Sequence, residues 1–187
     1  MISIALLAGQ QLLSAPNVES SKVILDSYFQ VIEDRLCLSD GSKYNYFSVA
    51  PRSDAVVVLA ITEDNRVLLN QEYRHPTGKF LLTCPGGKIE EEEPIITAQR
   101  ELLEETGFTA EEFVYLGSAY PYPGISCQKI YFVLAKRVSK VQEPNRDPGE
   151  IQETLLLTLE EVKRMIQNGT DIDGQLGTAF FLYSQLK

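Results

Sequence analysis

The chain has 187 residues, 44% of them hydrophobic, and a formal net charge of −9 at pH 7. This length suits one domain, or one domain with a small appendage, that buries a substantial core. The negative charge argues against a general surface for nucleic acid or anionic membranes, but a phosphate substrate stays possible where bound metal reverses the local field. The three cysteines, Cys37, Cys84 and Cys127, suit neither a disulfide framework nor a zinc site, so we expect a reducing, cytoplasmic location.

The first residues, Met1 to Gly9, form a short apolar segment. A signal peptide would have a lysine or arginine ahead of the apolar run, and this segment has none. No run along the chain approaches the roughly 20 apolar residues that a membrane-spanning helix needs. We therefore expect neither secretion nor a membrane partner.

Two segments near the N-terminus predict antiparallel β-structure. Residues 23–38 and 43–49 are rich in strand-forming side chains, and a turn signal at 39–42 separates them. We accordingly divide the chain into a small N-terminal β subdomain, residues 1–48, and a main domain, residues 49–187.

The main domain mixes predicted strands and helices. Residues 55–61 are a continuous apolar run, as expected of a strand that is covered on both faces. The other strands are predicted at 67–74, 113–119, 130–135 and 154–157. A first helix is predicted to begin at Pro94, which suits the first helical position, and to end before Gly107, which suits the left-handed position after a helix.

Two further helices are indicated by capping signals near the C-terminus. Thr158 and Glu161 form a capping-box pattern, and Gly169 closes the helix that they open. Asp173 is positioned to cap a last helix. Strands of both directions with helices on both faces predict an α/β fold with α/β/α layers.

The stretch from Gly86 to Phe108, GGKIEEEEPIITAQRELLEETGF, carries the clearest chemical signal. Glu101, Glu104 and Glu105 are spaced i, i+3 and i+4, so their carboxylates project from one helix face. These like charges repel one another, and negative charge near a helix C-terminus is also unfavourable. A bound cation offsets both effects, and hard oxygen ligands suit Mg²⁺ or Mn²⁺. The alternative is a solvated acidic helix face.

The spacing within this stretch matches a known family. From Gly86 there are five residues, a glutamate, seven residues and then Arg-Glu-Leu-x-Glu-Glu-x-Gly-Phe. Every fixed position of the Nudix hydrolase signature is filled, so the chain resembles that family. The resemblance implies a Nudix α/β/α sandwich with a mixed sheet. It also implies that Glu101, Glu104 and Glu105 hold Mg²⁺ (or Mn²⁺), that Arg100 positions these carboxylates, and that a backbone carbonyl at Gly86 joins the metal shell.

Two details of the signature stay open. Gly86 and Gly87 follow a short apolar strand, and we expect them to form a turn whose backbone approaches a ligand closely. Family members usually open the signature at the second glycine of such a pair, but counting from Gly87 reaches Arg100 one residue too early. Either Gly86 opens it or the loop has lost a residue, so the glutamate that partners Arg100 is Glu92 or Glu93.

The wider chain resembles the ADP-ribose pyrophosphatase branch of the family. The shared features are QEYRHP at 71–76, PGGKIE at 85–90 and Pro123 beyond the signature. The chain departs from the branch at Tyr122, where a serine is frequent, and at Cys127–Gln128, near which a glutamate often lies. The departures bear on the substrate and leave the reaction class unaffected.

The resemblance implies hydrolysis of the pyrophosphate bond of a nucleoside diphosphate sugar, with ADP-ribose giving AMP and ribose 5-phosphate. The resemblance implies that water attacks with metal assistance, and from the negative charge we expect no nucleic-acid partner. Alternatives are GDP-mannose, another nucleotide sugar, an oxidised nucleotide, or a Nudix-fold regulator that binds a ligand without turnover.

Several residues are candidates for contact with the substrate. Arg74 has a guanidinium that can hold a phosphate in two hydrogen bonds, with a strand-end salt bridge as the alternative. Arg52 is a weaker phosphate candidate, and Pro123 joins this set through the resemblance. The family likeness also implies a homodimer in which residues 1–48 pack across the two-fold axis. Tyr28 and Phe29 would then stack on adenine, with core packing as their alternative.

The polar, proline-containing loop 142–150 is a candidate for water activation. Similar enzymes carry a glutamate here that orients or deprotonates the attacking water. Glu150 fits this role best, and Glu143 and Glu153 are the alternatives.

Overall fold

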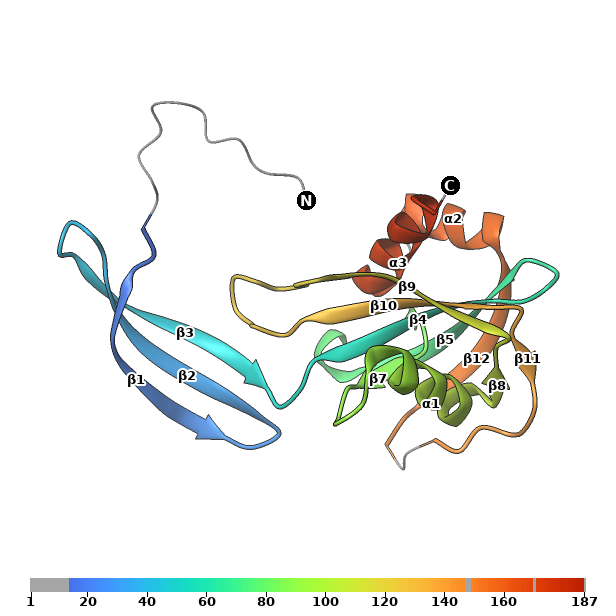
Figure 1. Ribbon diagram of the computed structural model, residues 1–187, viewed down its shortest axis with the longest axis horizontal. Coiled ribbons are helices and arrows are strands. Elements are labelled where there is room, and N and C mark those ends of the chain that lie inside the picture. The colour runs from blue at the N-terminus through green and yellow to red at the C-terminus, as the bar shows by residue number, and fades with distance from the viewer. Residues whose placement is uncertain (1–13, 147–148, 170, 187) are drawn as a thin grey trace. The chain divides into compact units, whose positions relative to one another are not determined.

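The computed structural model describes residues 14–146, 149–169 and 171–186 (Figure 1). These residues divide into two compact units. The first contains the described residues up to Arg52 together with Gly124–Ser126, and the second contains the remainder. The apolar N-terminal segment discussed above, Met1 to Gly9, lies outside the described residues.

The first unit is a three-stranded antiparallel sheet. Its strands lie in the order β1 (Asn17–Asp26), β2 (Phe29–Cys37) and β3 (Lys43–Pro51). The predicted β-segment 23–38 is therefore divided between two strands, with a tight turn at Ser27 and Tyr28. The N–H of Val49 donates to the carbonyl of Ile125 (2.6 Å), which attaches the later segment to this unit.

The apolar side chains of the first unit are unusually exposed. Every residue of β1 is exposed, and no helix covers the sheet within the described part of this unit. The exposed large apolar side chains of the three strands are Val18, Val23, Ile24, Leu25, Phe29, Tyr44 and Phe47. A sheet of this size needs another surface against its apolar side chains for stability.

The second unit is built around a seven-stranded mixed sheet. Its main path is β12 (Gln152–Thr158), β5 (Arg66–Arg74), β4 (Ala55–Ile61), β10 (Ile130–Lys136) and β9 (Glu112–Ala119). The short strand β6 (Lys79–Thr83) pairs with β5, and β7 (Gly86–Lys88) pairs with β4. Strands β4 and β10 are parallel, whereas the other pairs are antiparallel. A two-stranded ribbon joins β8 (Phe108–Thr109) to β11 (Ser139–Lys140), and a 3₁₀ turn, η1, spans His75–Thr77.

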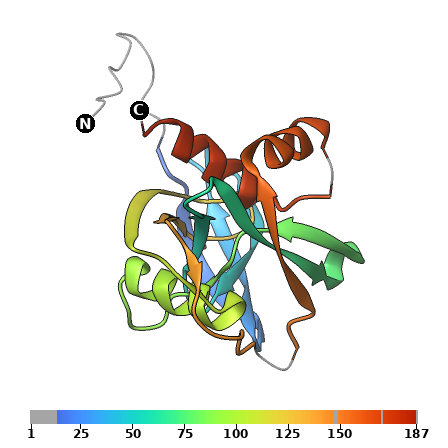
Figure 2. The same cartoon turned by 90° about the vertical axis from the view of Figure 1, so that its right-hand side faces the viewer.

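Helices cover both faces of this sheet, as Figure 2 shows. The first is α1 (Pro94–Thr106), followed by α2 (Leu159–Asn168) and α3 (Gly174–Ser184). Alternate residues of β4 enter two separate cores because successive side chains of a strand point to opposite faces. Val58 packs in the core that contains Leu102 of α1, and Leu59 packs in the core that contains Val162 of α2 and Leu176 of α3. The predicted α/β/α layering and doubly covered strand are confirmed.

The helix boundaries follow the predicted local signals. Pro94 occupies the first turn of α1, and Gly107 ends it with a left-handed backbone (φ 75°). Thr158 and Glu161 form the capping box of α2, and Asp173 caps α3 by accepting a hydrogen bond from the N–H of Gln175. None of the helices among the described residues has the length and apolar character needed to cross a membrane.

One local prediction was wrong. Gly86 and Gly87 do not form a turn but lie in β7, where they pair with Val57 and Val56 of β4. The cause is a long-range backbone pairing, which the glycine-rich local sequence does not reveal.

Candidate active site

The carboxylate of Glu105 is buried where α1 packs against β5 and β7. The residue is only 8% exposed. Its Oε2 accepts hydrogen bonds from the side-chain amide of Asn70 (3.0 Å) and from the backbone N–H of Gly86 (3.1 Å). Both donors are neutral, so these hydrogen bonds leave the negative charge of Glu105 without a cationic partner.

Burial above all, with smaller contributions from the charges of Glu101, Glu150 and Glu72, raises the pKa of Glu105 to about 8, against the lowering effect of the hydrogen bond from Gly86. Burial also raises the pKa of Glu101, against the lowering effect of Arg100. The pKa of Glu72 is likewise raised by burial, with Arg74 opposing. Four carboxylates therefore act on one another, and we call them the acidic group: Glu101 and Glu105 of α1, Glu72 of β5 and Glu150 before β12.

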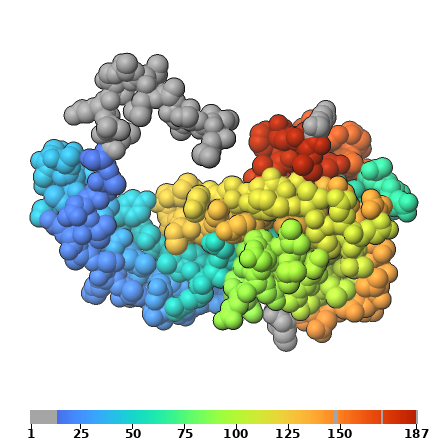
Figure 3. Space-filling model, viewed as in Figure 1, coloured from blue at the N-terminus to red at the C-terminus, as the bar shows by residue number. Residues whose placement is uncertain are grey.

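Arg100 connects the carboxylates on the outer side of α1. Its Nη1 lies 2.9 Å from Glu101 Oε1 and 2.9 Å from Glu104 Oε2, and its Nε lies 3.5 Å from Glu92 Oε2. The partner of Arg100 from the preceding loop is thus Glu92, while Glu93 is the residue that precedes the first turn of α1. Figure 3 shows α1 (light green) at the surface of the second unit.

Both glycines of β7 lie close to atoms of neighbouring residues. A Cβ atom at Gly86 would lie 2.2 Å from the carbonyl oxygen of Val56. A Cβ atom at Gly87 would lie 2.3 Å from Oε1 of Glu101. Gly86 therefore allows β7 to pack against β4, and Gly87 leaves room for a carboxylate of the acidic group.

The donor set fits a divalent cation by its chemistry. Among the described residues, no three acidic, histidine or cysteine side chains already stand at the spacing of a metal site, and Arg100 is ion-paired with Glu101 and Glu104. Glu105, however, is a buried carboxylate with neutral donors and with three further carboxylates raising its pKa. Isolated buried charge is unfavourable, and oxygen ligands of this type suit Mg²⁺ or Mn²⁺.

A family model for the NUDIX domain matches residues 51–177. The chain belongs to the Nudix family. It is 31% identical to the ADP-ribose pyrophosphatase of Bacillus subtilis over 95% of this chain and 94% of that protein. The predicted resemblance is confirmed, and this Nudix protein is a pyrophosphohydrolase.

Other relatives widen the comparison. A GDP-mannose pyrophosphatase of Escherichia coli is 29% identical over 82% of this chain and 87% of its own length. A methanol dehydrogenase activator of Bacillus methanolicus is 37% identical over 60% and 62%, respectively. The crystal structure of an ADP compounds hydrolase has a TM-score of 0.83 and 22% identity, covering 94% of this chain and 96% of that one, which shows the same fold.

The three candidate glutamates for water activation, Glu143, Glu150 and Glu153, lie in different surroundings. The charge of Glu150 raises the pKa values of Glu72, Glu101 and Glu105, so Glu150 acts on the acidic group. Glu143 forms an exposed ion pair with Lys140 (2.7 Å). Glu153 is an exposed residue of β12, paired across the sheet with Gln71. The surroundings favour Glu150 among the three.

Residues that sequence reasoning missed surround Glu105. Arg146 donates from Nε to the backbone carbonyl of Glu105 (2.8 Å) and from Nη2 to the hydroxyl of Thr154 (2.8 Å). Thr154 in turn donates to the carbonyl oxygen of the Asn70 side chain (3.0 Å). Asn70 could have been noticed because it directly follows the apolar run of β5 on a buried face, but Arg146 stands in a polar loop without a local signal.

The predicted substrate contacts are divided between the units. In the second unit, Arg74 Nη1 forms an ion pair with Glu72 Oε1 (2.7 Å), so the strand-end salt bridge is present, yet 42% of the Arg74 side chain is exposed. Glu72 was another missed residue. Pro123 is exposed in a turn of the same unit.

In the first unit, Arg52 is ion-paired with Asp26 and donates to the carbonyl of Ser27 (3.0 Å). Tyr28 is 70% exposed and Phe29 is 40% exposed. Neither aromatic side chain packs into a core within the described part of this unit.

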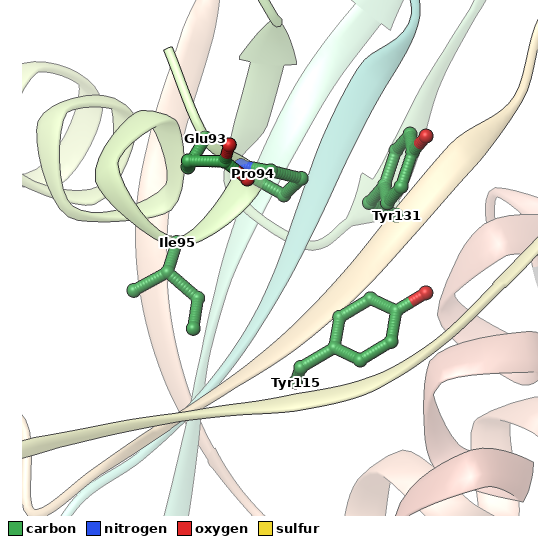
Figure 4. Close-up of a pocket in the computed structure, with 5 residues that line it drawn as sticks. All are labelled: Glu93, Pro94, Ile95, Tyr115 and Tyr131. Atoms are coloured by element: carbon green, nitrogen blue, oxygen red, sulfur yellow. The ribbon is translucent and has the colours of Figure 1, made fainter.

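A separate pocket of about 470 Å³ opens at the N-terminal end of α1, away from Glu105 (Figure 4). Its lining residues are Glu93, Pro94, Ile95, Tyr115 and Tyr131. Since a helix rises about 1.5 Å per residue, Ile95 and Glu105 are separated by about 15 Å along α1. The acidic group therefore does not line this pocket.

Proposed function

We propose that this protein hydrolyses the pyrophosphate bond of a nucleoside diphosphate sugar with Mg²⁺ or Mn²⁺, and that ADP-ribose, giving AMP and ribose 5-phosphate, is its substrate. The observation that carries the proposal is the buried carboxylate of Glu105 on the same helix as Glu101 and Glu104, both of which are ion-paired with Arg100. The likeness to a named ADP-ribose pyrophosphatase along nearly the whole chain supports the choice of substrate.

Residues of α1 and β7 would hold the metal. We assign this role to the carboxylates of Glu101, Glu104 and Glu105 and to the backbone carbonyl of Gly86. When bound, a divalent cation neutralises phosphate oxygens and lowers the pKa of bound water. Arg100 contacts Glu101 and Glu104 at 2.9 Å and keeps their carboxylates together through charge-assisted hydrogen bonds.

The remaining steps belong to polar side chains around the acidic group. Glu150 accepts the proton of the attacking water, supported by its electrostatic effect on Glu101 and Glu105. Arg74 holds a phosphate group with the exposed part of its guanidinium. Its ion pair with Glu72 keeps the side chain near the acidic group.

We also propose a homodimer formed through the first unit. The support is the set of exposed apolar side chains on β1 to β3, which need a covering surface. Tyr28, Phe29 and Arg52 stay candidate contacts to the substrate in that dimer, with Pro123 from the main domain. A cytoplasmic location fits the three cysteines, all of which are free of disulfides.

A panel of nucleotide sugars tests the proposed reaction. Purified protein with Mg²⁺ is given ADP-ribose, GDP-mannose and other nucleoside diphosphate sugars, and phosphate is measured after a coupled phosphatase. We expect kcat/KM to be highest for ADP-ribose. Absence of turnover with every compound would refute the proposed function.

Arg74→Ala, with Arg66→Ala as its control, tests the phosphate contact. Arg66 is the first residue of β5 and Arg74 is the last. Both form surface ion pairs, Arg66 with Asp64 (3.0 Å) and Arg74 with Glu72 (2.7 Å). We expect Arg74→Ala to raise KM by about tenfold or more, the loss of one charge-assisted hydrogen bond, whereas Arg66→Ala leaves KM unchanged. Equal KM values in the two variants would remove Arg74 from the binding site.

Two of the relatives suggest an alternative substrate and an alternative function. The similarity to a GDP-mannose pyrophosphatase favours GDP-mannose as the second candidate substrate. The similarity to a methanol dehydrogenase activator favours a regulator as the second candidate function. Calorimetric binding of a nucleotide sugar without hydrolysis would identify a regulator, and hydrolysis of GDP-mannose alone would change the substrate without changing the reaction.

A further inference from the structure

A partly buried series of hydrogen bonds links the loop after β11 to the carboxylate of Glu105. Arg146 Nη2 donates to Thr154 Oγ1 (2.8 Å), Thr154 donates to Asn70 Oδ1 (3.0 Å), and Asn70 Nδ2 donates to Glu105 Oε2 (3.0 Å). Asn70 is fully buried. Arg146 Nε also donates to the backbone carbonyl of Glu105 (2.8 Å). The guanidinium therefore contacts Glu105 directly as well as through Thr154 and Asn70.

The chemistry of these groups fixes the direction of every bond. A guanidinium has only donors, so the hydroxyl of Thr154 must accept from Arg146 and direct its own proton elsewhere. That proton goes to the carbonyl oxygen of Asn70, which leaves the amide nitrogen of Asn70 facing Glu105. A reversed Asn70 would place its carbonyl oxygen against the carboxylate of Glu105, and Thr154 therefore selects the orientation that donates.

We propose that Asn70 and Thr154 are positioning residues for Glu105, and that Arg146 sets their hydrogen-bond direction. The proposal rests on the proposed function, in which Glu105 holds the metal. Two N–H groups, from Asn70 and Gly86, fix one carboxylate oxygen of Glu105. Its second oxygen is thereby held in one direction, as a metal ligand requires.

The series also joins two parts of the proposed active site. Arg146 donates from Nη1 to the backbone carbonyl of Gln152 (3.1 Å), and Gln152 donates from its side chain to Glu150 (3.3 Å). The residue assigned to accept the proton is thus connected to the same arginine that orients the support of Glu105. Loss of Arg146 should disturb both groups, whereas loss of the Thr154 hydroxyl should disturb Glu105 alone.

Thr154→Val tests the proposal because valine keeps the shape and removes the hydroxyl. Mn²⁺ binding is measured by electron paramagnetic resonance of the free ion, together with kcat and thermal unfolding. We expect Mn²⁺ affinity to fall by about 10-fold to 100-fold, the usual effect of removing a group that orients a metal ligand. Thr154→Ser keeps the hydroxyl and should restore affinity. Thr97→Val is the matched control, since Thr97 is buried in α1 and its hydroxyl donates to the backbone carbonyl of Glu93 (3.4 Å).

A double-mutant cycle gives the second test. If Thr154 acts through Asn70, Asn70→Leu combined with Thr154→Val should bind Mn²⁺ no more weakly than Asn70→Leu alone. Additive losses would overturn the series. Should Asn70→Leu fail to fold, Thr154→Val decides alone: unchanged Mn²⁺ affinity and kcat with a lower melting temperature would show a purely structural hydroxyl and overturn the proposal.

The same measurements separate this proposal from the proposed function. Wild-type protein that hydrolyses no nucleotide sugar, while Thr154→Val weakens Mn²⁺ binding and Thr154→Ser restores it, would refute the function and support the positioning role. Wild-type protein that hydrolyses ADP-ribose, while Thr154→Val binds Mn²⁺ and turns over normally, would refute the positioning role and support the function.

Discussion

Glu105→Gln should have two opposite effects: it should lower catalytic activity and raise the stability of the metal-free protein. The substitution keeps the shape of the side chain and its ability to accept the hydrogen bonds from Asn70 and Gly86, but it removes the charge. We expect kcat to fall by about 10²-fold or more, the scale of losing one strong electrostatic contribution to a transition state. In the presence of a chelator, we expect the variant to be more stable than the wild type.

The size of the stability gain follows from the pKa. Burial, helped by the charges of neighbouring carboxylates, raises the pKa of Glu105 from 4.5 to about 8. A raised folded-state pKa means that the stability is fully present below the unfolded value of 4.5 and is lost as pH rises toward 8. At about 1.4 kcal/mol per pKa unit, the metal-free protein loses on the order of 1 kcal/mol by pH 5 and about 4 kcal/mol by pH 7.5. The glutamine variant avoids this loss.

Thermal unfolding in EDTA at about pH 5 and about pH 7.5 measures the difference. The advantage of Glu105→Gln in unfolding free energy should grow by about 3 kcal/mol between these values, or roughly 6 to 12 °C in Tm for a chain of this size. Glu91→Gln makes the same charge change in the exposed loop before α1 and should follow the wild type. Identical pH dependence of wild type and Glu105→Gln would refute the reasoning.

Three further predictions concern the metal, the end of α1 and assembly. Activity should disappear in excess EDTA and return with Mg²⁺ or Mn²⁺, and equal turnover in chelator would contradict the mechanism. Gly107→Ala should lower the free energy of unfolding, measured in urea, by at least about 2 kcal/mol more than Gly169→Ala does. Both glycines have a left-handed backbone, but of the two only Gly107 would place a Cβ against a backbone oxygen, that of Gln142 at 2.1 Å. Equal losses in the two variants would contradict this reasoning. Light scattering should give about twice the chain mass of 21.0 kDa, and deletion of residues 1–48 should weaken solubility or substrate binding; a monomeric full-length chain whose truncated form keeps its KM would contradict the dimer.

The features that were predictable from sequence are those set by neighbouring residues. Pro94 and Gly107 bound α1, and Thr158 with Glu161 begins α2, because each signal acts within one helical turn. The spacing of the glutamates on α1 likewise follows from helix geometry alone. The predicted turn at Gly86 and Gly87 was wrong because these residues pair with β4, about thirty residues earlier in the chain, and no local pattern encodes that pairing.

The acidic group depends on the order of strands in the sheet. Glu72 and Glu150 act on Glu105 because β5 lies between β4 and β12, which brings three separate segments to one place. Sequence spacing identified Glu105 and offered Glu150 as one of three loop candidates. It offered no reason to select Glu72, because the position of β5 relative to α1 is a property of the whole sheet.

The contact between Asn70 and Glu105 could nevertheless be inferred from the sequence by combining the helical period of α1 with the two-residue period of β5. Glu105 falls seven residues after Ala98 and three after Leu102, so it continues the buried stripe of α1. Asn70 falls two residues after Leu68, so it continues the face of β5 that packs against α1. A buried polar group without a partner costs about 1–3 kcal/mol. Two polar residues in apolar positions on facing elements therefore have a strong reason to bond to each other, as they do at 3.0 Å. What this reasoning requires beyond sequence is the placement of α1 over β5, which the strand order of the whole sheet determines.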